Sequence, residues 1–186
     1  MSNVYFIGDL HFGHANITKF RTQFGSEKEH RQFVMETWSE CVGKRDIVYV
    51  MGDAAFTQEG LDSIGTLVGT KILVRGNHDL LPTEAYLGVF KEIYGIINYK
   101  GLWLTHAPIH PTELYGRTNV HGHCHRGGPM EVHNSLPKVG GEFAPAGTLA
   151  TYFNTCAEHL PTPYKPIECG AMREIVSKRI QQHSLN

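Results

Sequence analysis

The sequence has no long apolar run, no paired cysteine motif and no excess of charge of either sign. No stretch approaches the roughly 18 consecutive apolar residues that a membrane-spanning helix needs, and no basic segment precedes the first apolar one. Lys and Arg total 17 against 18 Asp and Glu, which gives no strong electrostatic attraction to duplex nucleic acid. We therefore expect a soluble protein that neither enters a membrane nor binds duplex nucleic acid tightly.

The four cysteines lie far apart, and none belongs to a C-x-x-C pair that would hold zinc or form a redox dithiol. Such usage is typical of free thiols in a reducing compartment, so a cytoplasmic location is expected. A chain of 186 residues with 41% hydrophobic content fits one domain over residues 1–186. At about residues 126–147, paired glycines and prolines without periodicity predict a long loop or hairpin excursion.

Short apolar, β-branched runs alternate with helix-like stretches in the first half of the chain. Strands are predicted at residues 4–8, 47–52, 71–75, 93–99, 102–105, 119–122 and 148–155, with an edge segment at 164–167. Helices are predicted at residues 26–43, 58–67, 83–94 and 171–183. Ser26 and Glu29 have the spacing of a capping box at the first helix. The order of these elements predicts an α/β fold in which helices pack against a mixed sheet.

Histidine is abundant, with 12 residues, and many histidines fall in five short polar clusters that follow the predicted strands. The candidate ligands in these clusters are Asp9, His11, Asp53, Asn77, His106, His123 and His125. Sheets covered by helices form their ligand crevice at the carboxyl ends of the strands, so these distant residues are expected to converge there. Alternation along a strand is expected to point Asp9 and His11 the same way, and likewise His123 and His125.

The clusters together offer carboxylate, amide and imidazole ligands, a set that suits two divalent metal ions. Manganese is the expected metal, with iron, zinc, nickel or cobalt as alternatives, because calcium prefers oxygen ligands alone. Asp53, alone after its strand, is the natural carboxylate to bridge both ions. Two metal ions that share a water molecule lower its pKa and so supply hydroxide at neutral pH. They also bind the attacking and leaving oxygens of an in-line displacement at phosphorus, so these residues predict hydrolysis of phosphate esters.

Residues beside Asn77 offer the proton that a poor leaving group needs. His78 is predicted to act as the general acid, since imidazole titrates near neutral pH. Asp79 is predicted to orient and charge that imidazole. Arg75 is a candidate for stabilising the phosphoryl oxygens, although an arginine at a strand end is more often a surface ion-pair partner.

The motifs, in this order, resemble those of the calcineurin-like metallophosphoesterases. They are Asp9-x-His11, Gly52-Asp53, Gly76-Asn77-His78-Asp79, Thr105-His106 and Gly122-His123-x-His125. The run from Asp9 to Ile17 is further similar to the compact branch of that family found in bacteria and their viruses. The resemblance implies a four-layer αββα sandwich and a phosphodiesterase that acts on a small nucleotide-type or cyclic diester, or on an RNA end.

The resemblance also implies a role for each motif residue. One metal ion would be held by Asp9, His11, Asp53 and His125, and the other by Asp53, Asn77, His106 and His123. His78 would donate the proton, and His14 would lie behind the ligands or face the phosphate.

Other interpretations of the same residues stay open. A phosphomonoesterase, including a protein phosphatase, is the nearest enzymatic alternative, and a non-catalytic scaffold that binds a partner is the alternative of another class. The segment 76–79 alone is compatible with an ordinary turn. A mononuclear zinc site that uses Cys124 would need this side chain to face the same way as its neighbouring histidines, which strand alternation opposes. The remaining histidines, expected at the surface, are His30, His110, His133, His159 and His183.

Overall fold

The computed structural model describes residues 2–125 and 151–184, and in this part of the chain it contains two mixed sheets. The strand order of the first sheet is β4 (Glu92–Tyr94), β3 (Thr70–Val74), β2 (Ile47–Val50), β1 (Val4–Ile7) and β9 (Ile167–Glu168). The order of the second is β5 (Ile96–Tyr99), β6 (Leu102–Thr105), β7 (Thr118–His121) and β8 (Tyr152–Asn154). Strands β1 to β4 are parallel, as are β6 to β8, whereas β9 and β5 pair antiparallel at one edge of each sheet. The predicted excursion at 126–147 lies outside the described residues.

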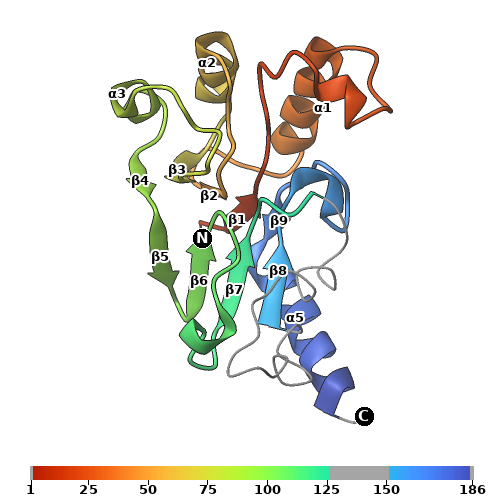
Figure 1. Cartoon of the computed structure of the whole chain (residues 1–186), viewed down its shortest axis with the longest axis vertical. Coiled ribbons are helices and arrows are strands. Elements are labelled where there is room, and N and C mark those ends of the chain that lie inside the picture. Colours follow the sequence, from red (N-terminus) through yellow and green to blue (C-terminus); the bar gives the residue numbers. More distant parts are fainter. Residues whose placement is uncertain (1, 126–150, 185–186) are drawn as a thin grey trace.

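Four α-helices are described. They are α1 (Glu27–Ser39), α2 (Gln58–Thr66), α3 (Thr83–Leu87) and α5 (Cys169–Ser184). Helices α1 to α3 gather at one end of the molecule, and α5 lies at the other end beside β8 (Figure 1). None of the helices in the described part of the chain is long and apolar enough to cross a membrane. The α/β sandwich predicted from the sequence is thus confirmed.

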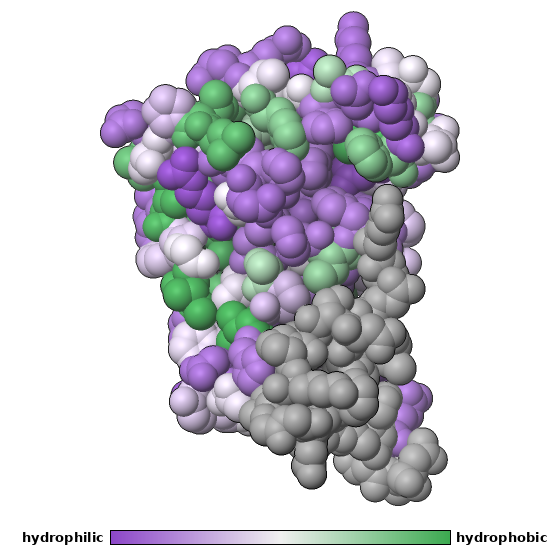
Figure 2. Space-filling view, viewed as in Figure 1, coloured by the Kyte–Doolittle hydropathy of each residue, from purple (hydrophilic) through white to green (hydrophobic). Residues whose placement is uncertain are grey.

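The central strands are apolar along their whole length because both of their faces are covered. In β1 the last three residues are all buried, and β2 repeats the pattern, so neither strand alternates between core and solvent. Phe6 and Val50 from the first sheet and Leu104 and Val120 from the second belong to one continuous core. Burying each such side chain contributes about 1.5–3 kcal/mol. On the face drawn in Figure 2, apolar residues form small separate patches among polar ones.

Helix α1 begins where the capping residues predict. Ser26 Oγ accepts a hydrogen bond from the backbone N–H of Glu29 at 3.1 Å, and Glu29 Oε2 accepts one from Gly25 N–H at 2.8 Å. The first bond satisfies a backbone donor that the first turn leaves free, and the second ties the preceding residue to that turn. On its inner side the helix buries Val34 and Trp38, and the Trp38 indole N–H donates to the Val68 carbonyl.

The structure corrects the predicted elements between residues 83 and 99. The third helix ends at Leu87, followed by Gly88, whereas periodicity predicted it to run to about residue 94. The chain then pairs with β3, and at Gly95 it passes from the first sheet to the second, so the single strand predicted at 93–99 is two strands in different sheets. Figure 1 shows β4 and β5 following one another in this way. Sheet pairing here outweighed the local helical pattern.

Candidate metal centre

The predicted ligands lie in loops just beyond the strands rather than in the strands themselves. Strand β1 ends at Ile7 and β7 at His121, so strand alternation does not orient the ligand pairs that follow them, and this part of the prediction is wrong. Asp9 and His11 instead have φ angles of 57° and 54°, and His123 has 69°. Left-handed backbone at residues other than glycine costs about 1–3 kcal/mol each and persists where surrounding structure enforces it.

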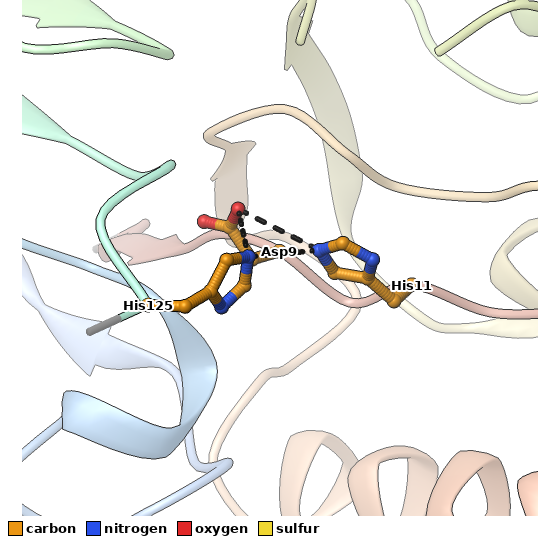
Figure 3. A group of neighbouring side chains, drawn as sticks. All are labelled: Asp9, His11 and His125. Carbon is orange, nitrogen blue, oxygen red and sulfur yellow. Dashed lines mark hydrogen bonds and ion pairs between the residues drawn. The ribbon is translucent and has the colours of Figure 1, made fainter. Parts of the chain in front are cut away.

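Asp9, His11 and His125 form the first group of candidate ligands (Figure 3). Asp9 Oδ1 is 3.2 Å from Nε2 of His125 and 3.7 Å from Nε2 of His11. The two Nε2 atoms are 3.1 Å apart. One ligand atom from each residue lies within 4.8 Å of the others, so one cation can contact all three.

The second group gathers around His106. Its Nε2 is 2.9 Å from Oδ1 of Asn77 and 3.4 Å from Oδ1 of Asp53. The His123 ring lies edge-on to the His106 ring, with centroids 5.1 Å apart. Asp9 also comes within 4.8 Å of Asp53 and His106, so the two groups adjoin.

Asp53 lies between the groups and reaches a histidine of each. Its Oδ2 is 3.8 Å from Nε2 of His11, while its Oδ1 faces His106. The Asp53 backbone is also left-handed, with φ of 49°. This is the arrangement that a bridging carboxylate requires.

The electrostatics of the cluster favour a cation. Asp9 and Asp53 are 0% and 1% exposed, so two carboxylates share one water-excluded space. Burial alone raises the pKa of Asp9, but hydrogen bonds from His11 and His125 hold it well below its usual range. Burial lowers the pKa of His125, yet hydrogen bonds to Asp9 and Glu158 outweigh it and raise that pKa to about 10. Without a metal ion, a proton on His125 offsets part of the negative charge of the carboxylates. A divalent ion would neutralise the same charge, so the residues present fit such ions.

Three glycines let the ligand loops approach one another this closely. A Cβ on Gly52 would strike the His106 ring, and one on Gly76 would strike Asp53. A Cβ on Gly122 would strike the Asp9 carboxylate. Each glycine of the sequence motifs therefore keeps space open for a ligand.

The rings of His78 and His14 both contact Phe56. The Phe56 ring stacks on His78 with centroids 5.2 Å apart, and it contacts the His14 ring edge-on at 4.6 Å. His78 is tied to the cluster through its backbone N–H, which donates to Asp53 Oδ1 at 2.8 Å. Burial lowers the pKa of His14. Phe56, which also stacks on His11, is a site residue that none of the sequence motifs includes.

The structure places Asp79 and Arg75 in supporting positions. The Asp79 carboxylate accepts backbone N–H bonds from Asp53, Ala54 and Gly76 at 2.8–2.9 Å, and thereby joins two ligand loops. The Arg75 guanidinium donates to backbone carbonyls of its own loop, including that of Asp79. The predicted orienting of His78 by Asp79 and the contact of Arg75 with substrate stay predictions without a corresponding contact among the described residues.

Several residues of the site carried no sequence signal. His30, predicted at the surface, is fully buried, and its Nε2 lies 2.6 Å from Nη1 of Arg21. The Cys156 thiol donates to Asp9 Oδ2 at 3.2 Å. Burial raises the pKa of this thiol, so it remains a protonated donor beside the carboxylate. Glu158 contacts His125 from the far end of the chain.

Fold and ligand set together define a mixed α/β protein with candidate metal ligands clustered at its strand ends. The chain belongs to the calcineurin-like phosphoesterase family, whose sequence profile matches residues 2–148. Members of this family typically bind divalent metals and hydrolyse phosphoesters.

Two proteins and one solved structure illustrate what this chain is similar to. The chain is 43% identical to the Gene 66 protein of Mycobacterium phage D29 over 84 residues, which span 42% of this chain and 41% of the phage protein. It is 31% identical to an uncharacterised protein of Methanocaldococcus jannaschii over 133 residues, 67% of this chain and 70% of that protein. A crystal structure of a protein of unknown function from Aquifex aeolicus superposes with a TM-score of 0.67 at 26% identity, covering 96% of this chain and all of that one. The matched segment is thus about two fifths of the phage relative's length.

Proposed function

We propose that this chain is a dinuclear metal-dependent phosphodiesterase that acts on a small nucleotide-type or cyclic diester, or on an RNA end, with manganese as its metal, in the cytoplasm. The observation that carries the proposal is the position of Asp53, whose two oxygens face His11 on one side and His106 on the other. A carboxylate placed in this way serves two cations better than one. An intact ligand set supports an enzyme over a scaffold, since such a constellation is useful chiefly for chemistry.

The proposed ligands divide into two sets that share Asp53. Asp9, His11, Asp53 and His125 would hold one ion, and Asp53, Asn77, His106 and His123 the other. When bound, the ions would supply a nucleophile from water at neutral pH and neutralise charge on the phosphoryl oxygens.

His78 is proposed as the group that protonates the departing alkoxide. It lies beside the cluster, with its ring stacked on Phe56 and its ring centroid 6.2 Å from that of His11. Stacking restricts the imidazole to one plane, which favours proton transfer in a fixed direction. His14, whose ring also contacts Phe56, is proposed to face the phosphate.

The proposal is tested by comparing two chromogenic esters. The purified chain, freed of metal with a chelator and reloaded with Mn²⁺, is assayed on bis-p-nitrophenyl phosphate and on p-nitrophenyl phosphate. We expect faster hydrolysis of the diester, and none of either by the chelated protein. Preference for the monoester would contradict the diester assignment, and no turnover of either ester would favour a binding scaffold.

A further inference from the structure

A largely buried carboxylate supports His125 from behind. Glu158 Oε1 is 2.6 Å from Nδ1 of His125, while the opposite ring nitrogen, Nε2, faces Asp9 and His11. A carboxylate only accepts hydrogen bonds, and a neutral imidazole carries a single N–H. With carboxylates at both nitrogens, the ring without a metal ion can carry a proton on each. When a metal ion replaces the proton on Nε2, the bond to Glu158 keeps the remaining proton on Nδ1 and so directs the metal to Nε2.

Arg21 holds Glu158 in this position. Its Nη2 donates to Glu158 Oε2 at 2.6 Å and to the backbone carbonyl of Asp9, also at 2.6 Å. Its Nη1 donates to the Leu10 carbonyl at 3.3 Å and pairs with Nε2 of His30. Arg21 is only 4% exposed, so these bonds are screened little by solvent. One guanidinium thus connects the carboxylate behind His125 to the loop that carries Asp9.

We propose that Glu158, held by Arg21, is a positioning residue that aims Nε2 of His125 at Asp9 and His11 and thereby sets the metal affinity of this half of the cluster. The inference rests on the proposed function, because it assumes that His125 is a metal ligand. Histidines that bind metals commonly donate their second N–H to a carboxylate, which fixes the ring and increases its basicity.

Glu158 is better placed to support a ligand than to act as one. Its carboxylate, the Cys156 thiol and a His125 nitrogen come within 4.8 Å of one another, which by itself would allow a cation. Both Glu158 oxygens are already engaged, however, one by His125 Nδ1 and the other by Arg21. The two nitrogens of an imidazole point in different directions, so an ion at Glu158 would not be the ion at Nε2.

The first experiment is calorimetric titration of the metal-free full chain with Mn²⁺. We compare the wild type with Glu158→Gln, with Glu158→Asp, which keeps the charge, and with Glu40→Gln as the matched control, since Glu40 is an exposed partner of Lys165. For Glu158→Gln we expect about a 10- to 100-fold loss of affinity at one of two metal positions, the usual effect of removing such a partner. The other position should be unchanged, Glu158→Asp should recover part of the loss, and Glu40→Gln should bind like the wild type.

A measurement on the unaltered protein covers the case in which Glu158→Gln does not fold. In the Zn²⁺-loaded wild type, ¹⁵N spectra of the imidazoles should show His125 with a proton on Nδ1 and the metal on Nε2. Metal on Nδ1, equal loss at both positions, or wild-type affinity in folded Glu158→Gln would overturn the inference and leave the proposed function standing. A wild type that binds no divalent ion would overturn both.

Discussion

The two halves of the ligand cluster are held in place by different means. His106 is 6% exposed, and its Nδ1 is 2.8 Å from the backbone carbonyl of Met51, so the main chain of the β2 end fixes its ring. The His125 side chain is 37% exposed, and its Nδ1 is held by the side chain of Glu158. A backbone anchor survives most substitutions, whereas a side-chain anchor can be removed by one. The His106 half is therefore held by the fold itself, whereas the His125 half depends on a separate polar network.

Removing the carboxylate that both halves share should have the largest effect. We expect Asp53→Asn to abolish tight binding of two ions and to lower turnover at least about 1,000-fold, the upper end for loss of one electrostatic stabiliser. The shape of the side chain is kept, so circular dichroism should show a folded protein. Manganese stoichiometry and turnover are the measurements, and two ions bound with wild-type affinity would contradict the bridging role.

Removing the proposed proton donor should leave both halves intact. We expect His78→Ala to keep its metal content while turnover of an alkyl diester falls at least about 100-fold. Turnover of a p-nitrophenyl diester should fall much less, because p-nitrophenolate leaves without a proton. If metal is lost as well, His78 is a ligand; if both diesters slow equally, it is not the general acid.

A substitution beside Asp53 should disturb the His106 half through sterics alone. A Cβ on Gly76 would collide with Asp53 and come within 3.0 Å of the His106 ring, so Gly76→Ala should cost about 1–3 kcal/mol of stability, as overpacking does. Its affinity for metal should fall with it. Gly95→Ala is the control, because a Cβ at Gly95 meets nothing within 4 Å in the described part of the chain. Equal unfolding curves for the two variants would show that a methyl group fits at position 76 without cost, and would contradict the prediction.

A pH dependence of stability is expected in the network behind His125. Burial, with the nearby Arg21 charge, lowers the pKa of His30 to about 3. The unfolded state, with a pKa of about 6.5, then binds more protons than the folded state, so stability falls as pH drops from about 6.5 toward 3.

Urea unfolding between pH 7 and 4 checks this dependence. His30→Gln should show a shallower decline than the wild type, because its amide can still accept from Arg21 but does not titrate in this range. His110→Gln, whose ring bonds Thr112 in its own loop, should follow the wild type. A His30→Gln profile as steep as that of the wild type would assign the decline to other groups.

The elements that carry the ligands could be predicted from sequence because their signals are local. Apolar runs followed directly by Asp9, Asp53 or His106 identify both the strands and the polar residues at their ends. Ser26 likewise fixes the start of α1 through neighbours three residues away. The early end of α3 depended on pairing with another strand, which no local pattern contains.

The residues that hold the candidate ligands in place could not be predicted, because those that contact one another are distant along the chain. Glu158 meets His125 from 33 residues away and Arg21 from 137. His30 is buried beside Arg21, with which it shares no motif. The left-handed backbone at Asp9 and Asp53 depends on tertiary contacts rather than residue type, since aspartate only tolerates this conformation.

Whether two divalent ions share the carboxylate of Asp53 can be measured by electron paramagnetic resonance while the metal-free protein is titrated with Mn²⁺. We expect saturation at two ions per chain with the spectrum of a spin-coupled pair. Saturation at one ion, or two ions with independent spectra, would contradict it.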